Sequence, residues 1–191
     1  MKLYAALLMS VSLAACATAP EPRMASAATT GDAWFDGAQE TLAQRKAVKP
    51  VMGKAKNVIL FVADGMDPTT VAATRIYDGQ SRGEEGEENL LSFERFPNLA
   101  MSKTYNTDLQ TPDSAGTMSA MATGYKTRAG LISVKKEARR GDCEASLKAH
   151  AKTFVEIAEM AGKATGVVST ARLIHATPAA NYAHVPDRNW E

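Results

Sequence analysis

The chain of 191 residues is poor in several features, and each scarcity narrows what the protein can be. It has 2 cysteines, which excludes a disulfide-dense secreted scaffold. The 22 lysines and arginines nearly balance the 21 aspartates and glutamates, so the net charge is only +1. This balance argues against a nucleic-acid partner and against a polybasic surface that binds membranes. With so few cysteines, stability must come from a hydrophobic core rather than from disulfides.

The apolar run at the start of the chain is too short to cross a bilayer as a permanent helix. Residues 1–15 combine a basic start, an apolar centre and small residues before Cys16, which is typical of an export signal peptide. Leu13-Ala-Ala-Cys16 resembles a bacterial lipobox, in which cleavage leaves the cysteine as a lipidated N-terminus. An ordinary cleaved signal is the alternative. The lipobox predicts a bacterial envelope protein, anchored by lipid to the outer membrane and facing the periplasm or the exterior.

Residues 16–49 are rich in Ala, Pro, Thr, Ser and Gly and are expected to form a tether, with a helical run at 38–47. Residues 50–191 are expected to form one domain. Lipid on Cys16 would leave Cys143 as the only other cysteine, so no disulfide within the chain is expected.

The domain reads as strands alternating with helices. Apolar runs predict buried strands at 57–63, 99–105 and 164–169. Helical spacing and caps predict helices at 67–77, at 114–123, from about 147 to 161, and after Thr177-Pro178. This alternation favours an α/β fold, a three-layer sandwich whose mostly parallel central sheet is covered by helices.

The stretch 111–127 carries the clearest candidate for chemistry. Asp113 and Ser114 are strong N-cap residues, and the Ala/Met-rich run after them favours a helix that ends at Gly124. Ser114 is therefore expected at a helix N-terminus, where unpaired N–H groups and the helix dipole favour a phosphate. A serine that attacks a phosphoester would need this environment. A plain helix cap is the alternative.

Two further stretches supply candidate ligands. Asp64 ends the strand at 57–63, and ligands of open α/β sheets bind at the carboxyl ends of strands. A solvated turn aspartate is the alternative. His175, Thr177 and Arg188 follow the strand at 164–169 and are plausible partners for a phosphate or a metal ion.

These three stretches together resemble the N-terminal part of alkaline phosphatase, in the order of that family. The resemblance is carried by Asp64-Gly-Met, by Pro112-Asp-Ser-Ala with its Thr-Gly-Tyr-Lys-Thr tail, and by His175-Ala-Thr-Pro followed by Asp187-Arg-Asn-Trp. It implies hydrolysis of phosphomonoesters through a phosphoserine on Ser114, in a site with two zinc ions and one magnesium ion. By the same resemblance, Arg188 would grip phosphate oxygens and Asp113 would orient Arg188.

The resemblance also implies the metal ligands. Asp64 would bridge metal ions, Ser114 would bind one of them, and Thr177 would be a magnesium ligand. His175 stands where family members carry either aspartate or histidine, and is expected beside the third metal. Most zinc ligands of the family come from the second half of its domain, and nothing in this chain replaces them.

We therefore expect a partial alkaline phosphatase-like domain that, alone, neither holds zinc tightly nor hydrolyses p-nitrophenyl phosphate faster than its Ser114→Ala variant. A homodimer is one way in which absent residues could be supplied. Two alternative functions remain at this point. One is a metal-dependent sulfatase or phosphodiesterase, against which the Asp-Ser-Ala context and the Arg188 motif count. The other is a non-catalytic, lipid-anchored fragment.

Overall fold

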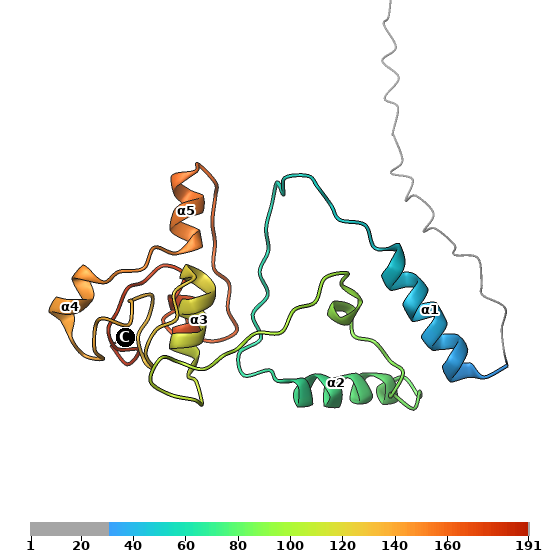
Figure 1. Cartoon of the computed structure of the whole chain (residues 1–191). Helices are drawn as coiled ribbons and strands as arrows, with labels where there is room; N and C mark the ends of the chain where they lie inside the picture. Colours follow the sequence, from blue (N-terminus) through green and yellow to red (C-terminus); the bar gives the residue numbers. More distant parts are fainter. Residues whose placement is uncertain (1–30, 191) are drawn as a thin grey trace, which may run out of the picture. The chain divides into compact units, whose positions relative to one another are not determined.

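The computed structural model describes residues 31–190 of the chain (Figure 1). The predicted signal peptide, Cys16 and the first part of the tether lie outside the described residues. The chain divides into two compact units, Met1–Ala55 and Lys56–Glu191.

The described part of the first unit contains one helix, α1 (Ala33–Ala47). The side chain of its N-cap residue, Asp32, accepts a hydrogen bond from the Phe35 N–H at 2.9 Å. This helix confirms the predicted helical run at 38–47 and begins five residues earlier. It has no buried residue, and Trp34 is 78% exposed. No helix within residues 31–190 is long and apolar enough to cross a membrane.

The second unit begins with α2 (Pro68–Ser81), followed by a 3₁₀ helix, η1 (Ser92–Arg95). Pro68 occupies the first helical turn, where its missing N–H costs nothing, and the Asp67 side chain caps the helix at 2.7 Å from the Thr70 nitrogen. The Arg75 guanidinium donates to both carboxylate oxygens of Glu94, at 2.7 to 3.2 Å, and so ties η1 to α2. The helix predicted at 67–77 is thus confirmed and runs four residues further.

The main core surrounds α3 (Ser114–Thr123), which has the bounds that its caps predict. Small side chains let α6 (Ala176–Ala179) pack closely against α3. The buried members of this cluster are Ala115, Met118, Ala122, Ile132, Ala176, Ala179 and Ala180. Burial of a side chain the size of Met118 stabilises the fold by about 1.5–3 kcal/mol. The helix that begins with Ser114 is therefore fixed by the core itself.

Buried hydroxyl groups also hold α3 in place. The Ser119 hydroxyl donates to the Leu131 carbonyl at 3.1 Å and accepts from the Ser133 N–H at 2.8 Å. Ser133, whose φ of 46° lies in the left-handed region, donates its own hydroxyl to the Ala180 carbonyl at 2.6 Å. The His184 ring contacts the Ser133 carbonyl at 2.8 Å. These bonds link α3, the chain after it, and the residue that follows α6.

The single helix predicted from about 147 to 161 is wrong, because two helices stand there: α4 (Cys143–Lys148) and α5 (Phe154–Met160). The chain between them pairs elsewhere, since the Lys135 N–H donates to the Ala149 carbonyl at 2.8 Å and the Ala151 N–H donates to the Ser133 carbonyl at 2.9 Å. Thr153 then starts α5 through a capping box with Glu156. Cys143, the first residue of α4, is free and exposed.

The predicted parallel sheet is not formed within residues 31–190. The β-bridges described there are two isolated antiparallel ones, Ile132 to Val185 and Val134 to His150. The apolar runs at 57–63, 99–105 and 164–169 have no strand assignment, and Phe61 is 88% and Val168 99% exposed. A strand acquires its ladder only from a neighbouring strand, and none of the described segments pairs with these runs.

Candidate active site

Ser114 is the first residue of α3, and Asp113 is its N-cap. The extended backbone of Asp113, with φ −108° and ψ 164°, lets its side chain turn back onto the helix. Its Oδ1 accepts from the Gly116 N–H at 3.0 Å, and its carbonyl accepts from the Thr117 hydroxyl at 2.9 Å. The partly buried Ser114 therefore lies at the positive end of a ten-residue helix, as predicted.

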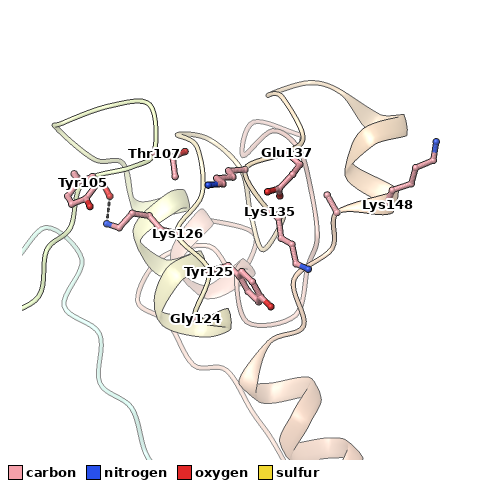
Figure 2. Close-up of a pocket in the computed structure, with 10 residues that line it drawn as sticks. Tyr105, Thr107, Gly124, Tyr125, Lys126, Lys135, Glu137 and Lys148 are labelled. Carbon is pink, nitrogen blue, oxygen red and sulfur yellow. Dashed lines mark hydrogen bonds between the residues drawn. The ribbon is translucent and has the colours of Figure 1, made fainter.

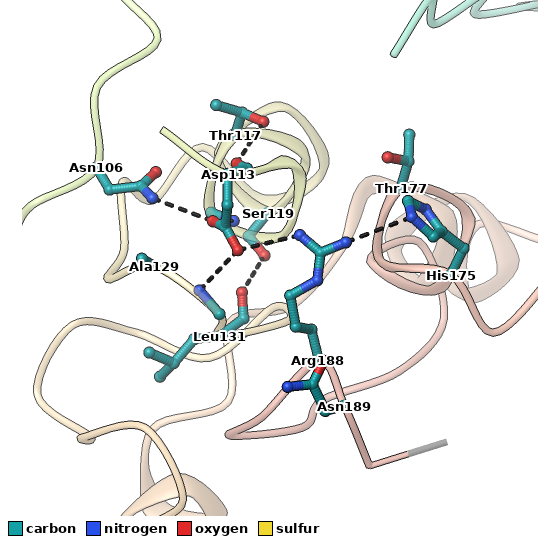
Figure 3. Close-up of polar contacts among 12 residues, drawn as sticks. Asn106, Asp113, Thr117, Ser119, Ala129, Leu131, His175, Thr177, Arg188 and Asn189 are labelled. Atoms are coloured by element: carbon teal, nitrogen blue, oxygen red, sulfur yellow. Dashed lines mark hydrogen bonds and ion pairs between the residues drawn. The ribbon is translucent and has the colours of Figure 1, made fainter. Parts of the chain in front are cut away.

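The Asp113 carboxylate is the centre of the local polar network (Figure 3). Besides capping α3, Oδ1 accepts from the Asn106 amide at 3.1 Å. Oδ2 accepts from the Gly130 N–H at 2.9 Å and from Arg188 Nη1 at 3.2 Å. Burial raises the pKa of Asp113, but the bonds from Gly116, Asn106, Arg188 and Gly130 outweigh it, so the net pKa lies below its ordinary value. Asp113 is therefore ionised when it faces Arg188.

Arg188 is held by its backbone as well as by its charge. Its N–H donates to the Gly130 carbonyl at 2.8 Å, and its Nη2 lies 3.4 Å from His175 Nε2. The preceding residue, Asp187, accepts from Arg140 Nη2 at 2.8 Å. This bond from Arg140 is the main reason why the pKa of Asp187 lies below its ordinary value. The loop from Gly130 to Arg140 thus fixes the backbone of Arg188 and the side chain of the residue before it.

The predicted metal ligands meet at the start of α6. His175 is the N-cap residue of α6 and Thr177 lies in its first turn. The Thr177 hydroxyl donates to Asp64 Oδ2 at 2.8 Å, and His175 Nδ1 lies 3.9 Å from the same oxygen. Since His175 also contacts Arg188, one connected group links the candidate metal ligands with the Asp113–Arg188 pair at the Ser114 helix.

The donor atoms of this group fit magnesium better than a zinc pair. Mg²⁺ binds through one or two carboxylates and keeps several waters, which suits Asp64 and Thr177. A catalytic zinc ion takes about three protein ligands. Within residues 31–190 there is no group of three His, Cys, Asp or Glu side chains placed to hold a metal.

Three contributors to the site were not predicted: Asn106, Gly130 and Arg140. Gly130 and Arg140 act through contacts with residues 17 and 47 positions away, Asn106 acts through Asp113 only seven positions away, and none belongs to a motif that the sequence displays. Gly130 has the clearest signal in retrospect. Its φ is 81°, which favours glycine, and a Cβ at this position would stand 2.7 Å from Arg140 Nε, so any larger residue would displace Arg140.

A serine at a helix N-terminus, an arginine held by a carboxylate, and an adjacent Asp–Thr–His group are side chains that a metal-assisted phosphoryl transfer could use. Comparison with known protein families identifies the family to which the chain belongs. The alkaline phosphatase family model matches residues 55–191, and the chain belongs to that family. This confirms the predicted family and sets aside the sulfatase and phosphodiesterase alternative.

Individual relatives agree with this assignment. Alkaline phosphatase of Gadus morhua is 42% identical over 172 residues, which are 90% of this chain and 34% of the relative. A cold-active alkaline phosphatase from Shewanella sp. superposes with a TM-score of 0.57 at 32% identity, over 68% of this chain and 30% of that one. A variant of TAB5 alkaline phosphatase with Mg bound in the M3 site superposes with a TM-score of 0.50 at 27% identity. The match covers 66% of this chain and 31% of that one.

The chain spans about a third of the length of the curated relatives it matches. Its solved neighbours are alkaline phosphatases, which have the predicted α/β fold class. Within this family zinc and magnesium are the expected cofactors, as the resemblance implied.

Proposed function

We propose that this protein hydrolyses phosphomonoesters, with Ser114 as the nucleophile. The observation that carries the proposal is the position of Ser114 at the start of α3, beside the Asp113–Arg188 pair with its 3.2 Å contact. A phosphoryl group placed against Ser114 would lie at the positive end of the α3 dipole, and the Arg188 guanidinium held by the neighbouring Asp113 would be available to bind its oxygens.

The residues of the chain divide the chemistry between them. Ser114 Oγ forms a bond to phosphorus while the ester bond to the alcohol breaks, and the departing oxygen takes up a proton. Water then attacks the phosphoserine, which releases inorganic phosphate and restores the hydroxyl. Arg188 has five N–H donors, of which Asp113 engages one and His175 lies close to a second, so three are left and its planar fork can still hold two phosphate oxygens.

Zinc and magnesium are the cofactors of this proposal. Asp64 and Thr177 would hold magnesium, with His175 beside it, and Asp64 and Ser114 would contribute to the zinc ions. When bound, such ions supply positive charge that makes a hydroxyl or a water a stronger nucleophile at neutral pH. Ligands from further polypeptide of family length would complete the zinc sites.

Phosphate binding is the part of this function that the described residues supply, so it is tested first. Arg188→Ala should weaken binding of inorganic phosphate by about tenfold to a hundredfold, the usual effect of losing hydrogen bonds to a charged group. Isothermal titration calorimetry would measure this change. Arg139→Ala removes an exposed arginine outside the site and should leave binding unchanged. Equal affinity of the wild-type and Arg188→Ala chains would contradict the proposed phosphate position.

The covalent step is tested in a chain extended to the full family length and loaded with zinc and magnesium. Acid quenching during turnover of a ³²P-labelled monoester should leave the label on Ser114, and Ser114→Ala should carry none. Label on the Ser114→Ala protein would show that another residue is the nucleophile.

We also propose the lipid anchor on Cys16 and the outer-membrane location that follows from the lipobox. A clickable palmitate analogue should label the wild type in bacterial cells and spare Cys16→Ser. Cys143→Ser is the matched control, since it removes the other cysteine and should remain labelled. Equal labelling of wild type and Cys16→Ser would rule out the anchor.

A further inference from the structure

A second feature of the molecule lies at the other end of α3. A pocket of about 860 Å³ opens beside Gly124, the C-cap residue of this helix (Figure 2). Its walls come from four short segments, around 105–107, 124–126, 135–137 and 148–149. Since a ten-residue helix is about 15 Å long, the pocket is well separated from Ser114.

Backbone hydrogen bonds fix the walls of this pocket relative to one another. The Thr107 N–H donates to the Thr127 carbonyl at 2.9 Å, and the Lys135 N–H donates to the Ala149 carbonyl at 2.8 Å. The fully buried Thr127 hydroxyl donates to the Val134 carbonyl at 2.6 Å and joins the two halves. The pocket is therefore built on a rigid frame rather than on a chance gap between loops.

The pocket concentrates positive charge in a chain that is almost neutral. Its lining includes four lysines and a single acidic residue, Glu137, whereas the chain as a whole has a net charge of +1. Lys148 pairs with Glu144 at 3.0 Å and points away from the other labelled lysines in Figure 2. Lys126, Lys135 and Lys136 remain, and within residues 31–190 no ion pair is described for any of them.

Two of these ammonium groups are positioned by aromatic rings. Lys126 Nζ lies 3.7 Å from the centre of the Tyr105 ring and donates to the Lys103 and Tyr105 carbonyls. Lys135 Nζ lies 4.7 Å from the centre of the Tyr125 ring. Lys126 thus gives two of its three N–H donors to carbonyl groups and offers an anion mainly its positive charge. In contrast, no hydrogen bond to the described part of the chain is found for the Lys135 ammonium, which lies over the Tyr125 ring. Lys136 is exposed beside them.

We propose that this pocket binds the phosphoryl groups of a polyphosphorylated anion, as a second anion site separate from Ser114. The alternative is that these lysines form an ordinary solvated face, as the sequence alone suggests for Lys135-Lys136. The fixed frame, the two lysine–tyrosine pairs and the scarcity of acidic side chains distinguish the pocket from such a face. The site does not depend on Ser114 acting as a nucleophile.

The number of phosphoryl groups follows from the exposure of the lysines. One ion pair at an exposed position changes affinity by no more than about fivefold, so a single phosphate bound here would be held weakly. When one ligand contacts several lysines at once, the small gains in affinity from the separate ion pairs multiply. Tripolyphosphate should therefore bind much more tightly than inorganic phosphate, and its affinity should fall as salt is added.

The test compares tripolyphosphate binding to the full chain by isothermal titration calorimetry. The double variant Lys135→Gln/Lys136→Gln should bind on the order of tenfold more weakly, because two exposed contacts are lost. Lys163→Gln removes an exposed lysine outside the pocket and should bind as the wild type does. Arg188→Ala should also keep its tripolyphosphate affinity at this site, which separates the result from the phosphate site at Ser114.

NMR locates the ligand. Tripolyphosphate should shift the ring resonances of Tyr105 and Tyr125 in the wild type and much less in the double variant, with circular dichroism confirming that both chains are folded. The proposal is overturned if the double variant binds tripolyphosphate as tightly as the wild type, if Lys163→Gln weakens binding equally, or if the Arg188→Ala chain, whose phosphate site at Ser114 is impaired, binds inorganic phosphate as tightly as tripolyphosphate.

Discussion

Asp113 connects the two halves of the candidate site, because a single carboxylate caps the Ser114 helix and holds the Arg188 guanidinium. Oδ1 is used by Gly116 and Asn106, and Oδ2 by Gly130 and Arg188. An alanine at this position would lose all four contacts at once. The residue is thus more than an N-cap, which is the most that its sequence context alone requires.

Asp113→Ala should lower the free energy of unfolding by about 2–3 kcal/mol, since it removes a helix cap and leaves donors without their acceptor. Asp142→Ala is the matched control. Asp142 caps α4 through one bond, to the Ala145 N–H at 2.9 Å, so its loss should cost about 1 kcal/mol. Urea unfolding followed by circular dichroism measures both. Similar losses for the two variants would show that the contacts beyond the cap add no stability.

The pH dependence of stability should also report on Asp113. Its pKa in the folded chain is lowered, mainly because hydrogen bonds to the carboxylate outweigh the effect of burial. The ionised group therefore stabilises the fold above its unfolded pKa of about 3.9, and this contribution is lost as the pH falls through the lower folded pKa. The stability difference between wild type and Asp113→Asn should be full at about pH 7 and should shrink steadily as the pH falls below about 3.9. A difference that grows toward acid pH would contradict this sign.

At the scale of elements, the starts and ends of the helices are predicted from local signals in the sequence. Where a helix is interrupted and where strands pair depends on contacts between distant parts of the chain. Asp67-Pro68 marks the start of α2, while Asp113 and Gly124 mark the two ends of α3. The break between α4 and α5 has no comparable local signal, because it depends on pairing between Lys135 and Ala149. The same distinction applies to strands, since a strand exists only where another strand pairs with it.

The residues of the candidate site also fall into two groups, those predicted from sequence motifs and those found only in the structure. Its six predicted residues were found from motifs, and within Lys56–Glu191 they form one connected region: Asp64, Asp113, Ser114, His175, Thr177 and Arg188. Asn106, Gly130 and Arg140 were not predicted, because each supports the site through a side chain or backbone contact that only the folded chain creates.

Gly130 and Gly124 offer a direct comparison of two elements that both require a positive φ. Alanine at Gly124, with φ 77° and open space around it, should cost about 1–2 kcal/mol of left-handed strain. Alanine at Gly130 adds an overlap with Arg140 Nε at 2.7 Å and disturbs the bonds to Asp113 and Arg188, so it should cost about 2–4 kcal/mol.

Urea unfolding measures the two stabilities, and phosphate titration supplies a second reading. Only Gly130→Ala should also weaken phosphate binding, because the Gly130 carbonyl accepts the hydrogen bond from the Arg188 N–H and Gly124 makes no such contact. Equal effects of the two variants on phosphate affinity would show that the loop from Gly130 to Arg140 does not position Arg188.

At the scale of the whole molecule, the buried core and the exposed apolar runs lead to different expectations. Around α3 the small apolar side chains are packed, and they anchor Ser114. The run at 57–63 enters this core only through Val62, while Val58 is 80%, Ile59 78% and Phe61 88% exposed. Apolar runs with unpaired backbone are sites at which other strands can add.

The 191-residue chain studied by itself should therefore self-associate as its concentration rises. Contiguous apolar surface drives association, and unpaired backbone groups in the exposed runs give it a direction.

Two variants test this expectation. Phe61→Lys places a charge in such a run and should reduce association. Leu147→Lys changes an isolated apolar residue that is 72% exposed on α4 and should have little effect. Sedimentation velocity over a range of concentrations distinguishes the outcomes. A closed homodimer would reach a limiting sedimentation coefficient, while strand addition would continue to larger species. A wild-type chain that stays monomeric at every concentration would show that the exposed runs are not association sites.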